Sequence, residues 1–178
     1  MRLYHGSSLP NLRELRPFRS NHEKPYVYLS DSATLALIYA HNPLTRPNGF
    51  FPYYFRDGQL HYDEYFPAQT RILYQGHGGC VYTCNAENVT QLDKMPWVYL
   101  SETPVPVAES TYIPDLYDAL MEAASDGRLI LHRYEDAPEA ARAMNRRIVR
   151  RSLEEHHHLD DPEDEYVQFL HRYMPEIF

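Results

Sequence analysis

The sequence predicts an α+β domain in which the N-terminal two-thirds is mostly β and the C-terminal third is helical. Two observations support this prediction. Short alternating, β-branched or aromatic runs recur up to about residue 113, and apolar residues at helical spacing follow from Pro114. The length of 178 residues suits one domain. We therefore expect a core over residues 1–113 and a mostly helical extension of the same domain over residues 114–178.

The expected strands are short and rich in aromatic residues. They are the runs RLYHG, KPYVYLSD, GCVYTCNA, PWVYLSETPVPV and RLILHRY. The pair Asp57-Gly58 between two aromatic-rich runs predicts a β-hairpin. The prolines of PWVYLSETPVPV suit the edge of a sheet or the end of a strand.

Four helices are expected. A short one, ATLALIYA, follows Asp31 or Ser32 as N-cap and stops before Asn42-Pro43. The second begins near Pro114, where apolar residues recur at helical spacing up to Asp126-Gly127. The third and fourth cover residues 138–156 and 162–173.

The charge is acidic overall but uneven along the chain. The formal net charge is −8, which argues against general affinity for nucleic acid. Residues 1–50 nevertheless carry six basic and three acidic side chains, a local charge of +3. Such a region suits a phosphorylated small molecule better than a duplex.

The cysteine usage and the N-terminal residues indicate a reducing, cytoplasmic setting. Cys80 and Cys84 lie about 13 Å apart on one face of an expected strand, too far for a disulfide, and are expected to be core thiols. MRLYHGSS holds no basic leader before an apolar run, and we expect no membrane segment. No metal is expected, and the triplet His156-His157-His158 is interpreted as a solvated helix end because consecutive histidines on a helix diverge.

The most informative pattern lies in the first forty residues. Tyr4-His5-Gly6-Ser7 ends the first expected strand, Tyr28-Leu29-Ser30-Asp31 ends the second, and Tyr39 follows eleven residues after Tyr28. This order resembles the His-Tyr-Glu branch of the ADP-ribosyltransferases, which includes the poly(ADP-ribose) polymerases and diphtheria-type toxins. The resemblance implies a split antiparallel sheet with a helical C-terminal cover, and NAD as the substrate.

Elementary chemistry indicates what such a pattern can do. Nicotinamide is a flat cation with a carboxamide, so its site needs aromatic faces and backbone groups that can bind the amide. Tyr28 and Tyr39 can supply the faces. Gly6 lets the backbone approach closely, and Ser7 can add a hydroxyl. The resemblance implies His5 as the ribose-binding histidine, Tyr28 as the triad tyrosine and Tyr39 as the second stacking ring. With Ser30, these residues form the expected NAD-binding set.

The chain departs from the family pattern at two positions. Ala36 stands where the polymerases have a serine that touches the amide, and Pro96 stands where the family strand carries its catalytic glutamate. Glu102 is the first choice for the missing carboxylate, followed by Glu109 and then Glu64. The expected catalytic set is therefore His5, Tyr28 and Glu102.

Three functions follow as hypotheses. The first is an NAD-dependent ADP-ribosyltransferase that releases nicotinamide and passes ADP-ribose to an acceptor that the sequence does not name. The second is an RNA 2′-phosphotransferase-like NAD enzyme, for which Arg13, Arg16 and Arg19 can hold a phosphate, although Tyr28 replaces the histidine of that family's motif. The third is a non-catalytic module of the same fold that binds NAD or another ADP-ribose-containing small molecule, which Ala36 and Pro96 favour.

Overall fold

The computed structural model describes residues 1–19, 24–41, 52–161 and 163–178. The chain forms two compact units that interleave along the sequence. The first unit comprises Met1–His41 with Tyr74–Ala123, and the second comprises Asn42–Leu73 with Ala124–Phe178. How residues 114–178 lie over the core therefore stays a prediction.

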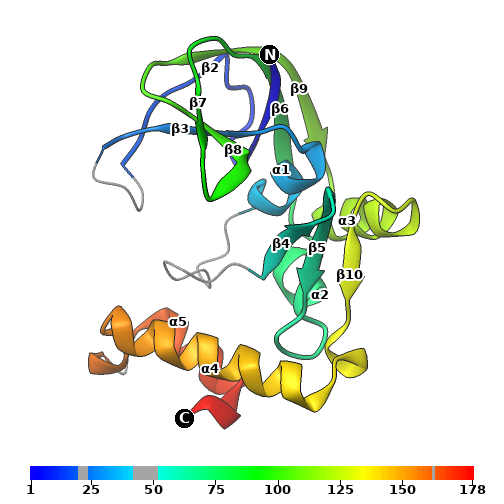
Figure 1. Ribbon diagram of the computed structural model, residues 1–178, viewed down its shortest axis with the longest axis vertical. Helices are drawn as coiled ribbons and strands as arrows, with labels where there is room; N and C mark the ends of the chain where they lie inside the picture. The colour runs from blue at the N-terminus through cyan, green and yellow to red at the C-terminus, as the bar shows by residue number, and fades with distance from the viewer. Residues whose placement is uncertain (20–23, 42–51, 162) are drawn as a thin grey trace. The chain divides into compact units, whose positions relative to one another are not determined.

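The first unit is built on an antiparallel sheet (Figure 1). The seven strands lie in the order β2-β9-β6-β1-β3-β8-β7, and every neighbouring pair is antiparallel. The strands are β1 (Arg2–Ser7), β2 (Glu14–Leu15), β3 (Val27–Ser30), β6 (Gly79–Asn85), β7 (Thr90–Leu92), β8 (Met95–Ser101) and β9 (Val105–Ile113). The predicted α+β class with antiparallel strands is confirmed.

The sheet has a weak seam between β1 and β3. Strand β1 pairs with β6 along its whole length, from Arg2–Asn85 to Ser7–Cys80. Towards β3 the register holds one pair, Tyr4–Ser30. The sheet therefore consists of two well-paired halves, β2-β9-β6-β1 and β3-β8-β7, that share a short ladder.

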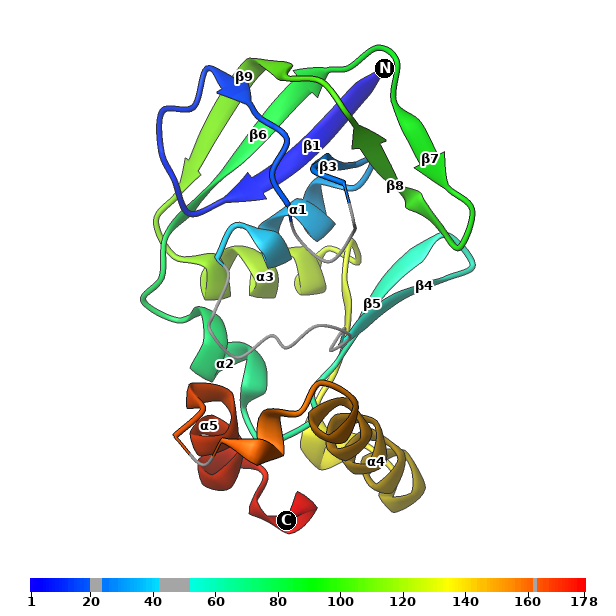
Figure 2. The same ribbon diagram turned by 90° about the vertical axis from the view of Figure 1, so that its left-hand side faces the viewer.

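Helix α1 (Ala33–Tyr39) packs against β1, β3 and β6 on one face of this sheet (Figure 2). Its N-cap is Ser32, because the Ser32 hydroxyl oxygen accepts a hydrogen bond from the Leu35 N–H at 3.1 Å. Gly6 and Gly79 let the helix lie directly on the strands. A Cβ on Gly6 would stand 1.9 Å from the Ala36 carbonyl oxygen, and one on Gly79 would stand 2.5 Å from the Ala40 carbonyl oxygen.

The opposite face of the sheet carries an apolar core. Leu3, Leu29 and Tyr82 are buried there, together with Cys80 and Cys84. Both cysteines are free, as predicted, and burial raises the pKa of Cys84 to about 11. Helix α3 (Leu116–Ser125) follows β9 and buries Leu116, Leu120 and Ala123, three of the residues at the predicted helical spacing.

The second unit joins a small sheet to helices (Figure 1). Its three strands lie in the order β10-β5-β4, with β10 parallel to β5 and β5 antiparallel to β4. They are β4 (Tyr53–Arg56), β5 (Gln59–Asp63) and β10 (Ile130–His132). The predicted hairpin is confirmed, and Asp57 and Gly58 have the positive φ values of 52° and 76° that a type I′ turn requires.

The helices of the second unit bury a separate core around Phe66, Val149, Leu153 and Leu170. These helices are α4 (Glu139–Glu155), α5 (Glu165–Tyr173) and all of α2 (Gln69–Tyr74) except its last residue. The unit also contains the 3₁₀ turns Tyr134–Asp136, His158–Asp160 and Pro175–Ile177. Helix α5 begins later than predicted, because the Asp164 carboxylate caps it by accepting from the N–H groups of Tyr166 and Val167. Pro162 lies outside the described residues.

The run PWVYLSETPVPV is not one strand, as the sequence pattern predicted, but parts of two. Strand β8 ends at Ser101, because the Ser101 hydroxyl bonds to Thr103 N and O within a tight turn. Strand β9 then continues to Ile113 along β6. The short elements β2, β7 and α2 were not predicted.

Candidate functional site

The expected ribose-binding histidine lies at the seam between the two halves of the sheet. The His5 Nδ1 atom is 2.8 Å from the main-chain carbonyl oxygen of Tyr28. A carbonyl oxygen only accepts hydrogen bonds, so Nδ1 carries the proton and donates it. The Nε2 atom of the neutral ring is therefore a hydrogen-bond acceptor.

Burial favours this neutral form of the ring. Desolvation lowers the pKa of His5 from 6.5, and the hydrogen bond to the Tyr28 carbonyl opposes the shift without cancelling it. At neutral pH the histidine presents a fixed acceptor, which suits a ligand hydroxyl group.

Gly6 and Tyr39 are also in contact at this seam. An added Cβ on Gly6 would lie 2.8 Å from the Tyr39 carbonyl carbon, so the main chain of β1 touches the last turn of α1. The absence of a side chain at Gly6 is thus required by helix packing. Tyr39 is 36% exposed as a residue, so it lies at the surface and not in the core.

Tyr28 belongs to an aromatic group on the same face as α1. Its ring lies 6.0 Å from that of Phe18 and 6.4 Å from that of Tyr26. Because side chains alternate along a strand and Tyr4 pairs with Ser30, Tyr28 shares its face with Gly6, whereas His5 shares the opposite face with Leu29. The main chain of Tyr28, not its ring, is thus what contacts His5.

The two serines of the expected set stabilise local turns. The Ser7 hydroxyl oxygen accepts from the Leu9 N–H at 3.1 Å, and the buried Ser30 hydroxyl oxygen accepts from the Ser32 N–H at 3.0 Å. The Ser30 bond helps to set the start of α1. His5, Gly6, Ser7, Tyr28, Ser30 and Tyr39 therefore all lie on β1, β3 and α1 of the first unit.

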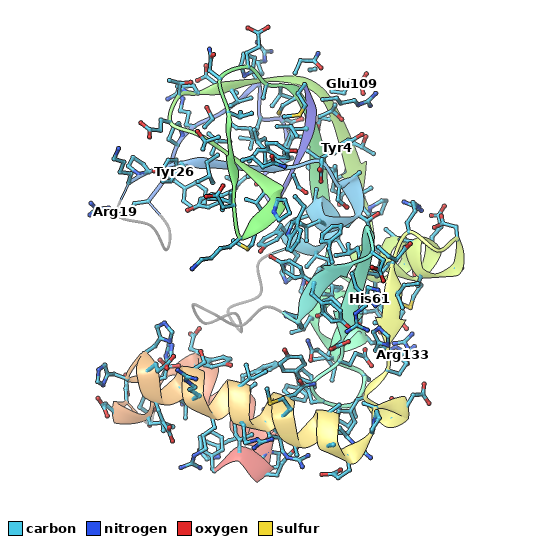
Figure 3. All side chains as sticks on the ribbon, viewed as in Figure 1. Tyr4, Arg19, Tyr26, His61, Glu109 and Arg133 are labelled. Atoms are coloured by element: carbon cyan, nitrogen blue, oxygen red, sulfur yellow. The ribbon has the colours of Figure 1, made fainter. Side chains whose placement is uncertain are left out.

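Of the three candidate carboxylates, Glu102 and Glu109 are exposed and paired. A Glu102 carboxylate oxygen lies 3.7 Å from the Lys24 ammonium. Since Glu102 follows Pro96 by six residues, it lies about 20 Å further along the strand direction at ~3.3 Å per residue. Glu109 on β9 lies 3.2 Å from the Arg2 guanidinium (Figure 3).

Glu64 is a structural residue of the second unit. Its side chain is wholly buried, and it accepts from the Thr70 N–H at 2.9 Å and from the Arg133 guanidinium at 3.3 Å. The Tyr134 N–H lies 3.4 Å from its second oxygen. These partners explain the burial of this carboxylate through the local fold.

Asp31 carries a carboxylate near Pro96 that was not among the predicted candidates. Asp31 accepts a hydrogen bond from the Tyr99 hydroxyl, and the Tyr99 oxygen accepts from Gln91 Nε2 at 3.0 Å. Gln91 Nε2 also donates to the Pro96 carbonyl. One chain of hydrogen bonds therefore joins Asp31 to the position where the resemblance implies a glutamate.

The second unit carries a histidine pair of its own, made by His61, which Figure 3 labels, and His132. His61 Nδ1 and His132 Nε2 lie 2.9 Å apart, so one ring donates and the other accepts. Desolvation, followed by the charges of His132 and Arg56, lowers the pKa of His61. Within the described residues, no group of three or more His, Cys, Asp or Glu side chains is arranged to hold a metal ion.

None of the helices in the described parts of the chain has the length and apolar character needed to cross a bilayer. Helix α4 ends at Glu155 and the side chain of His157 is 81% exposed, as predicted for a solvated helix end. The prediction was wrong for His158, whose side chain is 24% exposed because its Nδ1 lies 2.7 Å from the Asp164 carboxylate. Comparison with protein-family models, with curated proteins and with solved structures finds no match to this chain.

Proposed function

We propose that this chain is an NAD-dependent ADP-ribosyltransferase of the ADP-ribosyltransferase-like fold. The observation that carries the proposal is the His5–Tyr28 hydrogen bond at the seam where β1 and β3 share one register pair. The sheet with two well-paired halves supports the split sheet that the resemblance implies, and the seam joins the two strands that carry the His-Gly-Ser and Tyr-Leu-Ser motifs.

NAD contacts the seam through its ribose and through its nicotinamide ring. His5 Nε2 accepts a hydrogen bond from a ribose hydroxyl, since Nδ1 is committed to the Tyr28 carbonyl. The nicotinamide ring stacks on Tyr28 and Tyr39 on the α1 face, and its carboxamide bonds to the main chain at Gly6. This position lies beyond the Tyr4–Ser30 pair, where the described parts of β1 and β3 share no further register pair and the ribose can reach His5. Ser7 and Ser30 contribute hydroxyl groups beside them.

The reaction breaks the bond between the ribose C1′ and the pyridinium nitrogen. The bonding electron pair leaves with nicotinamide, which becomes neutral, and positive charge develops on the ribose. An acceptor nucleophile then bonds to C1′ and loses its proton. Fixed negative charge near the ribose lowers this barrier by several kcal/mol.

A non-catalytic module that binds NAD or ADP-ribose is the second candidate. Pro96 favours it, because proline cannot supply the carboxylate that the resemblance implies. The RNA 2′-phosphotransferase alternative is less well supported, since the guanidinium of Arg16 is paired with Glu14 at 3.0 Å.

Calorimetry and product analysis on the same protein sample separate these functions. The proposal predicts that NAD binds and that incubation yields nicotinamide with ADP-ribose, free or on an added acceptor. Binding with intact NAD recovered after long incubation would support the module instead. Absence of both binding and turnover would overturn the NAD-based proposals together.

A further inference from the structure

We propose that Asp31 is the carboxylate that stabilises the ribose cation, in place of the glutamate replaced by Pro96. This inference rests on the proposed function and names the residue on which its chemistry depends. Three features of Asp31 support it: the hydrogen bonds to its side chain, the face of the sheet on which that side chain lies, and its spacing from His5.

The Asp31 side chain is exposed but hydrogen-bonded. The Tyr99 hydroxyl donates to it, and Gln91 Nε2 in turn donates to the Tyr99 oxygen at 3.0 Å and to the Pro96 carbonyl. Tyr99 lies on β8, which carries Pro96 and pairs with β3 through Leu29–Tyr99. Asp31, one residue beyond the end of β3, is therefore linked through Tyr99 and Gln91 to the main chain of Pro96, where the resemblance implies a glutamate.

Asp31 and His5 lie on one face of the sheet. Tyr99 packs on the face that buries Leu3 and Leu29, and the carboxylate of Asp31 contacts Tyr99. Strand alternation puts His5 on that same face, because Leu3 and His5 are two residues apart on β1. Glu102 lies beyond the end of β8, in the turn that follows Ser101, and its carboxylate lies 3.7 Å from the Lys24 ammonium.

Spacing also favours Asp31 over Glu102. From the register pair Tyr4–Ser30, Asp31 is a diagonal neighbour of His5 on the adjacent strand, about 7–8 Å away. Glu102 lies two strands from His5 and about three residues along, roughly 14 Å away at 4.8 Å per strand and 3.3 Å per residue.

The charge environment of Asp31 is consistent with such a role. Asp31 is exposed, but neighbouring protein atoms displace enough water to raise the pKa of its carboxyl group, and hydrogen bonds to its own main chain and to Tyr99 counter the shift. Bound NAD would exclude water from this carboxylate and so strengthen its electrostatic interaction with the ribose. Tyr99 is a positioning residue, because it acts on the ribose only through the Asp31 carboxylate to which it is hydrogen-bonded.

Asp31→Asn tests the assignment, with Asp93→Asn as the matched control on the exposed β7–β8 turn. We expect Asp31→Asn to keep its melting temperature and NAD affinity while nicotinamide release falls about 100-fold, as for loss of a transition-state interaction. Asp93→Asn is expected to match the wild type. Tyr99→Phe should lower kcat about 10-fold with KM unchanged.

The outcomes separate this inference from the function on which it rests. An active wild type with undiminished release by Asp31→Asn would overturn the Asp31 assignment alone. A 100-fold loss in Glu102→Gln with no loss in Asp31→Asn would move the role to Glu102. A wild type that binds NAD but releases no nicotinamide would overturn both the enzyme function and this inference.

Discussion

The imidazole of His5 donates its Nδ1 hydrogen to the main-chain carbonyl of Tyr28 across 2.8 Å, where β1 and β3 share one register pair. This bond orients the ring and leaves Nε2 as its acceptor. It also connects the two halves of the sheet through a side chain.

NAD binding should weaken in acid as His5 takes up a second proton. Burial holds the pKa of His5 below 6.5, so Nε2 keeps its acceptor function at neutral pH and loses it as the pH falls through that lowered pKa. Calorimetric titrations from pH 8 to pH 5 measure the effect. His5→Gln, which has no titrating ring, should remove this component of the acid loss.

The same shift has a consequence for stability. Because the folded-state pKa of His5 is lowered, the unfolded chain binds its proton first, and stability falls as the pH decreases from about 6.5. The difference between wild type and His5→Gln isolates this contribution. Parallel pH dependences of unfolding in the two proteins would contradict the lowered pKa.

Gly6→Ala should destabilise the first unit strongly. The new Cβ would lie 1.9 Å from the Ala36 carbonyl oxygen, and a helix backbone cannot rotate away as a side chain does. We expect a loss of about 3 kcal/mol, at the upper end of the overpacking range. Fluorescence of Trp97, the only tryptophan, follows unfolding in urea.

Gly76→Ala is the control for this variant, because Gly76 has a φ of +76° and no atom within 4 Å of an added Cβ. It should cost about 1–2 kcal/mol from backbone strain alone. Equal losses in the two variants would argue against the close contact between β1 and α1.

Tyr39→Ala should weaken NAD binding without unfolding the protein. Tyr39 is 36% exposed as a residue and lies outside the buried core, so its removal should cost less stability than loss of a buried tyrosine. Loss of one stacking face should reduce NAD affinity by about 1–2 kcal/mol, roughly 5- to 30-fold. A large drop in melting temperature with unchanged affinity would show that the ring serves packing instead.

Glu64→Ala should destabilise the second unit. The substitution leaves the Thr70 N–H and the Arg133 guanidinium without their buried acceptor, at a cost of about 3 kcal/mol. Circular dichroism in urea measures the loss. Glu135→Ala, on the exposed surface nearby, should change stability by less than about 0.5 kcal/mol. Similar values for the two variants would contradict a structural role for Glu64.

Local patterns predicted most of the regular elements. The hairpin at Asp57-Gly58 and the cap at Ser32 depend on residues adjacent in sequence, and both were found where expected. The strands β2 and β7 span only two and three residues, so their pairing depends on distant partners. The division of residues 95–113 into β8 and β9 likewise follows from pairing with β3 and β6, which periodicity does not indicate.

The positions of the expected site residues were partly predictable, because several of them lie in local sequence motifs. His5, Gly6 and Tyr28 lie in short motifs at the ends of neighbouring strands, and a strand order inferred from the resemblance brings them together. The Asp31–Tyr99 contact joins residues 68 positions apart, and a single sequence gives no local signal for it. The packing role of Gly6 depends on α1 folding back onto β1, which likewise becomes visible only in three dimensions.

The most direct test compares nicotinamide release from NAD by the wild type and by His5→Ala at neutral pH, with melting curves as the folding control. We expect steady release by the wild type and a loss of at least about 100-fold in a His5→Ala variant that still folds. Equal release by both proteins, or none by a wild type that neither binds nor consumes NAD, would contradict the proposal that the His5–Tyr28 seam is an NAD site.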